Sequence, residues 1–155
     1  MAEAFTCHLQ WSGAEAGPTV DAATFSRDLL VSFDGPAELP MSAAPAYRGD
    51  RSRVNPELAF LSALSSCQAL TYLYLAARAG VTVTAYSDDA EAHLGIVDGR
   101  MRVSRATLRP SITLAPGADR AKAESLIEKA HEQCFISSSV TTKIAIEPRF
   151  VTAAG

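Results

Sequence analysis

The 155-residue sequence lacks the features that mark several large classes of protein. It has no uninterrupted apolar run of about 18 residues, so we expect no membrane-spanning helix and no membrane partner. Residues 1–11 do not combine a basic segment with an apolar one, which argues against a signal peptide. There is no basic run, and 14 Lys and Arg against 17 Asp and Glu give a net charge of −3. This balance argues against nucleic acid as the main partner.

Cysteine is scarce, and its three positions, Cys7, Cys67 and Cys134, form an odd set. A secreted disulfide framework uses an even and denser set of cysteines. We therefore expect a cytoplasmic protein, in which a retained pair of thiols serves redox or metal chemistry rather than structure. The default interpretation of any single cysteine is a small buried hydrophobic residue.

The length fits a single domain that spans residues 1–155. Hydrophobic residues make up 48% of the chain, which argues against disorder. A chain of this size buries roughly 70% of the surface that it exposes when unfolded. We therefore expect a true hydrophobic core that needs no metal or disulfide.

Apolar periodicity predicts strands on both sides of a long helix. The expected elements, in chain order, are strands at 5–11 and 24–33, an irregular loop at 36–54, a helix at 56–79, strands at 81–96 and 100–114 around a turn at 97–99, a helix at 119–133 and a strand at 143–151. The order β-β-α-β-β-α-β favours an α+β fold with mainly antiparallel strands. We expect four side chains of the later strands to face inward: Met101, Val103, Ile112 and Leu114.

The helix at 56–79 has clear ends and an unusual composition. Asn55 is a good N-cap, Pro56 suits the first helical position, and Gly80 can take the left-handed conformation that ends a helix. No charged side chain occurs at positions 58–77, so we expect a buried central helix about 36 Å long. A single small domain can hardly cover such a helix, which suggests a second subunit.

Cys67 lies on this helix, where an apolar environment would raise its pKa and leave the thiol inert. A nucleophilic Cys67 would need a nearby cation, and the helix offers none before Arg78, about 16 Å away. The loop before the helix carries three candidates: Arg48, Arg51 and Arg53. A buried Arg would need a carboxylate, for which Glu57 and Asp50 are available. The spacing of Cys67 and Cys134 does not by itself make them partners.

Two boxes in the sequence resemble those of a known family. The helix start Asn55-Pro56-Glu57 precedes Ser65-Ser66-Cys67, and the segment 130–136 reads AHEQCFI around Cys134. Together with the order of the elements, these boxes resemble the OsmC/Ohr family of small thiol-dependent peroxidases, and more closely its broad OsmC-like branch. The resemblance extends over nearly the whole chain.

The resemblance implies an intertwined homodimer that reduces organic hydroperoxides with electrons from an external dithiol. Carried over to this sequence, Cys67 would be the peroxidatic thiol, Cys134 the resolving thiol, and Glu57 the carboxylate that pairs with a catalytic Arg. Arg48 is the closest match to that Arg, and Arg51 or Arg53 could replace it. No metal, haem, flavin or other cofactor is implied.

Helix geometry adds a prediction about the dimer. Glu57 and Cys67 are ten positions apart, which on a straight helix is about 15 Å along the axis and about 280° of rotation. They therefore cannot share one pocket, and no Pro or Gly at positions 58–79 would break the helix. We expect the Glu57 that supports a given Cys67 to come from the partner chain.

Two other interpretations compete with the peroxidase. Cys7, His8, His131 and Cys134 could be drawn as a zinc site, but adjacent strand residues point to opposite faces, so we expect no metal site. The alternative function is a non-catalytic protein that binds a small hydrophobic ligand on the same fold. Reactivity of Cys67 towards a bulky hydroperoxide distinguishes the two functions.

Overall fold

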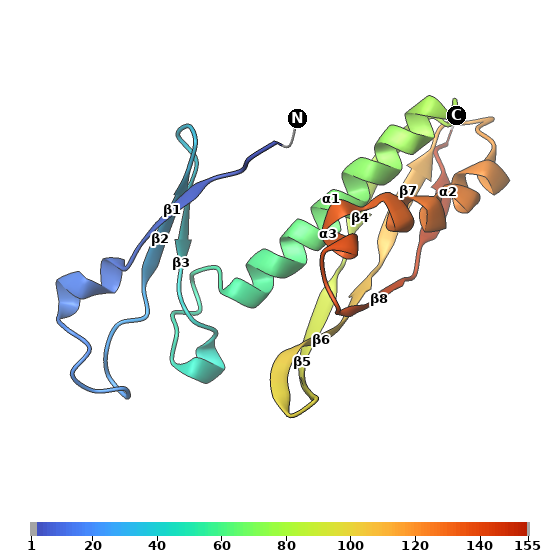
Figure 1. The fold of residues 1–155 in the computed structure, drawn as a ribbon. Coiled ribbons are helices and arrows are strands. Elements are labelled where there is room, and N and C mark those ends of the chain that lie inside the picture. Colours follow the sequence, from blue (N-terminus) through green and yellow to red (C-terminus); the bar gives the residue numbers. More distant parts are fainter. Residues whose placement is uncertain (1–2, 155) are drawn as a thin grey trace. The chain divides into compact units, whose positions relative to one another are not determined.

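The computed structural model describes residues 3–154, which form an α+β fold (Figure 1). The chain divides into two compact units, Met1–Ala59 and Phe60–Gly155. Helix α1 (Pro56–Arg78) begins in the first unit and continues in the second. The α+β class is as predicted, and a single domain over residues 1–155 stays a prediction.

The first unit contains a three-stranded antiparallel sheet, and the prediction gave it only two strands. Its strands are β1 (Cys7–Gln10), β2 (Leu29–Phe33) and β3 (Glu38–Met41), in that order, with single 3-10 turns η1 (Ser12–Ala16) and η2 (Pro45–Tyr47). Strand β3 lies in the segment predicted to be irregular. The strand predicted at 24–33 begins only at β2, because the Asp21 side chain and carbonyl accept hydrogen bonds from the next residues and hold them in a turn.

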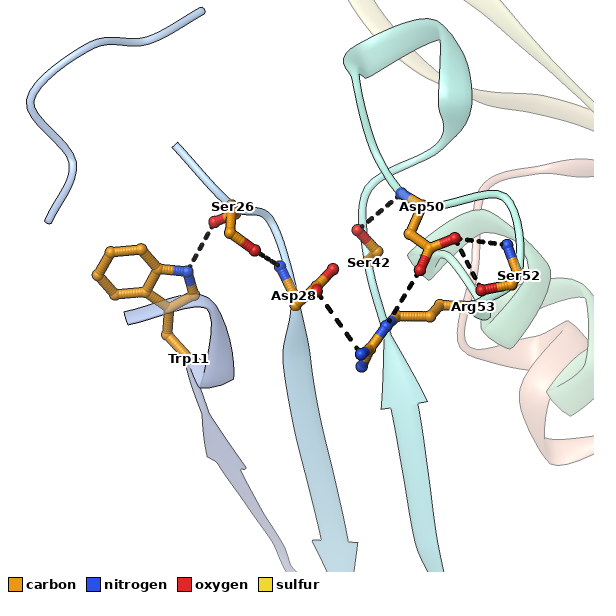
Figure 2. A network of polar contacts seen from close by, with 7 residues as sticks. All are labelled: Trp11, Ser26, Asp28, Ser42, Asp50, Ser52 and Arg53. Carbon is orange, nitrogen blue, oxygen red and sulfur yellow. Dashed lines mark hydrogen bonds and ion pairs between the residues drawn. The ribbon is translucent and has the colours of Figure 1, made fainter. Parts of the chain in front are cut away.

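Polar contacts hold the loop between β3 and α1 against this sheet (Figure 2). The Arg53 guanidinium lies 3.6 Å from the Asp28 carboxylate and 3.4 Å from that of Asp50. The Asp50 carboxylate accepts hydrogen bonds from the main-chain N–H and the hydroxyl of Ser52, and the N–H of Asp50 donates to the buried Ser42 hydroxyl. The loop therefore has a defined conformation despite its lack of regular structure.

The two ends of α1 are as the sequence predicts, but its burial is not. The Asn55 side chain accepts a hydrogen bond from the N–H of Leu58 at 2.9 Å, and Gly80 ends the helix with φ of 73°. Only one stripe of the helix is buried: Leu64, Gln68, Tyr72, Leu75 and Ala76. Leu70 and Tyr74 are 69% and 58% exposed, so the expected burial on all sides is wrong for a single chain.

Helix α1 is also long and apolar enough to cross a membrane, judged by length and composition alone. The core helices of soluble proteins pass the same test, so this property does not assign the helix to a membrane.

The second unit contains two three-stranded sheets. One has the order β4 (Val83–Asp88), β7 (Pro110–Leu114), β9 (Arg149–Thr152), and the other β5 (Glu91–Val97), β6 (Arg100–Leu108), β8 (Lys143–Ile146). The β4–β7 and β5–β6 pairs are antiparallel, whereas β8 and β9 join their sheets in parallel. The predicted strands at 81–96, 100–114 and 143–151 are thus each two strands, because the chain leaves one sheet and enters the other.

The second unit also holds the main core. Side chains from α1, β7, β9 and α2 (Arg120–Gln133) meet there: Tyr72, Leu75, Ala76, Val81, Ile112, Leu114, Ala123, Leu126, Ile127, Ala130 and Phe150. A smaller cluster joins Leu64 to Ala106 and Leu108. Ile112 and Leu114 face inward as predicted, but Met101 is 58% exposed, because it lies next to the turn of the β5–β6 hairpin. The one-turn helix α3 (Phe135–Ser138) follows α2.

Candidate active site

Cys134 lies at the junction of two helices. It caps the end of α2, where its N–H donates to the carbonyl of His131, and it is also the residue that precedes α3. Its extended backbone, with φ of −72° and ψ of 114°, turns the chain between the two helices. The side chain is completely buried. The sequence predicted the end of α2 but did not predict α3.

The structure brings Cys67 and Cys134 together. Cys67 is half-buried on α1, and its thiol lies near enough to Cys134 and to the main-chain N–H groups of Phe135 and Ile136 for these groups to affect its pKa. Both thiols are free. Cys7 lies on β1, in the other unit, and is exposed. Within the second unit, Cys67 and Cys134 are therefore placed to react with each other.

These contacts make Cys67 the more acidic thiol of the pair. Partial burial raises the pKa of Cys67, but hydrogen bonds from Ile136, Cys134, Phe135 and Thr71 stabilise the thiolate and leave the pKa below its ordinary value. None of these donors carries a positive charge. The need of Cys67 for a nearby cation therefore stays a prediction.

Cys134 shows the opposite tendency. Burial raises the pKa of Cys134, the neighbouring Cys67 raises it further, and the main-chain N–H of Ser137 lowers it only in part. Of the two thiols, Cys67 therefore loses its proton more readily than Cys134. This is the division of roles that a nucleophile and a resolving thiol require.

A pocket of about 480 Å³ opens between α1 and the segment from the end of α2 to α3. Its lining consists of Leu70, Thr71, Tyr74, Glu132, Gln133, Phe135 and Ser138. Thr71 connects the pocket to the thiol, since its hydroxyl donates to the Cys67 carbonyl at 2.8 Å and also contacts Sγ. The exposed side chains of Leu70, Tyr74 and Phe135 give the pocket an apolar wall.

The three candidate arginines belong to the first unit, Met1–Ala59, and they differ in their contacts. Arg53 is held by two carboxylates, whereas Arg48 and Arg51 are exposed and form no ion pair within residues 3–154. Arg48 has a left-handed backbone with φ of 65°. The next residue must be glycine, because a Cβ at Gly49 would lie 1.6 Å from the carbonyl oxygen of Ala43. The loop thus presents Arg48 in a fixed backbone conformation with a free guanidinium.

Glu57 is half-buried in the first turn of α1. Its Oε2 is buried and has no hydrogen-bond partner among the described residues. A buried carboxylate oxygen without a donor is costly, so this atom is well suited to receive an additional donor such as a guanidinium.

Within residues 3–154, no group of three or more His, Cys, Asp and Glu side chains is arranged to hold a metal ion. Cys7 and His8 lie on β1 in the first unit, whereas His131 and Cys134 belong to the second. The Nδ1 atom of His131 is buried and unpaired in the described part of the chain.

Comparison with known proteins identifies the family. A family model described as "OsmC-like protein" matches residues 49–149. The chain belongs to the OsmC-like family. This confirms the family resemblance seen in the two sequence boxes around Cys67 and Cys134.

Solved structures of OsmC-like proteins are similar over the whole chain. An OsmC-like protein of unknown function from Vibrio cholerae is 31% identical, with a TM-score of 0.88 and coverage of 96% of this chain and 99% of that one. An organic hydroperoxide resistance protein from Elizabethkingia anophelis is 22% identical, with a TM-score of 0.69 and coverage of 99% and 100%. An organic hydroperoxide resistance protein OsmC from Legionella pneumophila is 16% identical, with a TM-score of 0.63 and coverage of 97% and 98%. The comparison with curated proteins gave no match.

Sequence reasoning missed the donors to Cys67. Thr71 lies four residues after Cys67 on the same helix, and that spacing could have indicated a contact. Phe135 and Ile136 act through their main-chain N–H groups, which their side-chain identities do not reveal.

Proposed function

We propose that this OsmC-like protein is a thiol-dependent peroxidase that reduces organic hydroperoxides in defence against oxidative stress. The observation that carries the proposal is the proximity of Cys67, whose pKa is lowered, to the buried Cys134, whose pKa is raised. Perturbed and complementary pKa values in two adjacent thiols are typical of a reactive pair. Family membership supports the same chemistry.

The reaction would proceed in three steps. The Cys67 thiolate attacks the distal oxygen of the hydroperoxide, the O–O bond breaks, and the leaving alkoxide takes a proton and departs as an alcohol. Cys67 is then a sulfenic acid, and the Cys134 thiol attacks its sulfur, which releases water and forms a disulfide. An external dithiol reduces the disulfide by thiol–disulfide exchange and returns both thiols. Both electrons therefore come from the dithiol, and no cofactor takes part.

The pocket beside Cys67 supports an organic rather than an inorganic peroxide as substrate. Leu70, Tyr74 and Phe135 offer apolar surface to the organic group, while Thr71 lies between that surface and the sulfur. Two of the similar structures carry the name organic hydroperoxide resistance protein. On this chain we assign the pocket to the organic part of the substrate.

Arg48 and Glu57 complete the proposed site. Arg48 would stabilise the charge that develops on the leaving oxygen, and the free acceptor on Glu57 would orient its guanidinium. Ten positions on an unbroken helix separate Glu57 from Cys67, so Glu57 would come from the second subunit of a homodimer. The exposed apolar face of α1, with Leu70 and Tyr74, supports a partner of this kind. Three free cysteines suit a cytoplasmic protein.

The test is the stoichiometry of thiol loss with cumene hydroperoxide. The wild-type protein and Cys7→Ser should each consume one equivalent of peroxide and form one disulfide, whereas Cys67→Ser should consume none. Cys134→Ser should react once and stop at the sulfenic acid. If the wild-type thiols do not react, or if Cys7→Ser abolishes the reaction while Cys67→Ser does not, the proposal is wrong. Binding of the hydroperoxide without its reduction would favour the non-catalytic ligand-binding protein.

A further inference from the structure

Asp88 links the long helix α1 to a point where the chain changes sheets. It is the last residue of β4, and each of its two carboxylate oxygens accepts a short hydrogen bond. Oδ2 accepts from the Ser65 hydroxyl on α1 at 2.5 Å, and Oδ1 accepts from the main-chain N–H of Arg109 at 2.6 Å. Arg109 lies between β6 and β7, which belong to different sheets. One carboxylate therefore joins α1 to the crossing between the two sheets of the second unit.

Further contacts connect the crossing to its surroundings. The Arg109 guanidinium donates to Glu91, the first residue of β5, at 2.6 Å and to Glu147, which lies between β8 and β9, at 2.9 Å. The N–H of Glu147 also donates to the Leu108 carbonyl at 2.8 Å. The contacts join the three places where the chain passes between the two sheets, after β4, after β6 and after β8. Asp88 therefore belongs to a connected polar cluster rather than to an isolated strand end.

Ser65 and Cys67 lie on opposite margins of the buried stripe of α1. Seen down the helix axis, Ser65 is about 100° from the fully buried Leu64 in one direction, and Cys67 is about 60° from it in the other. The Cys67 margin faces the segment after α2, since Thr71, one turn further along α1, lines a pocket together with Phe135 of α3. The Ser65 margin is the one bonded to Asp88. The carboxylate therefore holds the helix on the side away from the thiol.

This hydrogen bond is well suited to fix the rotation of the helix about its axis. Apolar contacts along the stripe are non-directional, whereas a short hydrogen bond to a carboxylate has a preferred geometry. The bonds from the stripe to carbonyls of α2 are longer, 3.5 Å for Gln68 and 3.2 Å for Tyr72. Side-chain atoms lie about 5–6 Å from a helix axis, so a rotation of about 10° moves such an atom by about 1 Å. A displacement of about 1 Å can slow a reaction between aligned groups by about 100-fold.

We propose that Asp88 is a positioning residue for the disulfide-forming step. Through Ser65 it sets the rotation of α1 at Cys67, and thereby the alignment of the Cys67 sulfur with Cys134. The inference rests on the proposed function, in which the Cys134 thiol attacks the Cys67 sulfenic acid, the S–S bond forms, the S–O bond breaks and water leaves. Formation of a disulfide requires a specific geometry, so this step is sensitive to a small rotation of the helix.

The test separates the attack by Cys67 from the closure by Cys134, and it contains no peroxide. Reduced protein in the Cys7→Ser background, which removes the exposed competing thiol, is mixed with dithiobis(nitrobenzoate). The Cys67 thiolate attacks the reagent, forms a mixed disulfide and releases one aromatic thiolate. The Cys134 thiol then gives its proton to solvent, attacks the mixed disulfide at Cys67 and releases the second aromatic thiolate. Only the rate of the first phase depends on the reagent concentration, because the second phase is intramolecular.

The decisive comparison is between two neighbouring serines. Ser65→Ala removes the hydroxyl that donates to Asp88, and Ser66→Ala is the matched control, because the Ser66 hydroxyl donates to the Ala63 carbonyl of α1 itself. We expect Ser65→Ala to slow the second phase by about tenfold and to leave the first phase close to its wild-type rate. Ser66→Ala should keep both rates, and Ser65→Thr, which retains the hydroxyl, should keep most of the second.

Several outcomes would overturn the inference. They are equal second-phase rates in Ser65→Ala and Ser66→Ala, a Ser65→Ala protein that loses thermal stability but closes at the wild-type rate, and the absence of a second phase in the Cys7→Ser parent. A parent that shows both phases but does not reduce cumene hydroperoxide would refute the peroxidase and leave the positioning role intact.

Asp88→Asn provides an independent measurement from the other side of the hydrogen bond. Asn keeps the shape of the side chain and removes the charge that strengthens the bond from Ser65. The variant should slow the second phase, and its addition to Ser65→Ala should slow that phase little further, because both changes act on one interaction. Fully independent effects of the two substitutions on the second phase would contradict the proposal.

Discussion

Oxidation of Cys67 and Cys134 to a disulfide is expected to raise the free energy of unfolding by about 4 kcal/mol. The bond would close a loop of about 68 residues, and a cross-link over a loop of that length removes about 15 cal/mol/K of chain entropy from the unfolded state. The two thiols are already neighbours in the reduced protein, so the native backbone is expected to move little when the disulfide forms. The entropic gain should therefore be retained almost fully.

The assay is thermal unfolding of the Cys7→Ser protein in its reduced and peroxide-treated forms. A gain of this size corresponds to a rise in Tm of roughly 8–16 °C for a chain of about 150 residues. Cys134→Ser treated in the same way is the control, because it forms a sulfenic acid without a cross-link. If mass spectrometry confirms the Cys67–Cys134 bond and the Tm stays the same or falls, the two thiols are not positioned for an unstrained disulfide.

Three further outcomes test other parts of the site and the fold. Arg48→Ala should slow peroxide reduction at least tenfold, which corresponds to about 1.4 kcal/mol in the activation barrier. Arg48→Lys should restore the rate only in part, because Lys lacks the planar fork of donors of Arg. An unchanged rate in Arg48→Ala would move the role to another Arg. A mixed dimer of Glu57→Ala and Cys67→Ser chains should regain about half of the wild-type activity, since one of its two sites would have both groups; no recovery in a confirmed heterodimer would mean that both residues act from one chain. Leu64→Ala should lower the free energy of unfolding, measured by urea titration, by about 3 kcal/mol, because Leu64 is fully buried in the smaller core cluster. A loss below about 1 kcal/mol would show that the cluster collapses around the cavity.

The helices could be predicted closely because their ends depend on neighbouring residues. Asn55 caps α1 through its own side chain, and Gly80 ends the helix through its positive φ. Asp119 likewise caps α2, where its carboxylate accepts from the N–H of Lys122. Each of these contacts spans only a few positions, so the sequence contains both partners.

The strands could not be predicted as well, because their limits depend on distant partners. The chain turns from β6 to β7 at Arg109, whose N–H donates to the side chain of Asp88, 21 positions earlier. Strands β8 and β9 pair in parallel with β6 and β7, and no local pattern indicates such pairing. The apolar alternation therefore revealed strands but not the points at which the chain changes sheets.

The sequence by itself determined the α+β class, the limits of α1 and α2, and the two boxes that mark the chain as OsmC-like. All of these depend on side-chain types at short spacing. Only the tertiary structure decided that Cys67 lies near Cys134 and near the main-chain N–H groups of Phe135 and Ile136. The physical reason is that main-chain N–H groups are the same in almost every residue. Their effect depends on the change of backbone direction at Cys134 and on Cys67, which lies more than 60 positions earlier in the chain.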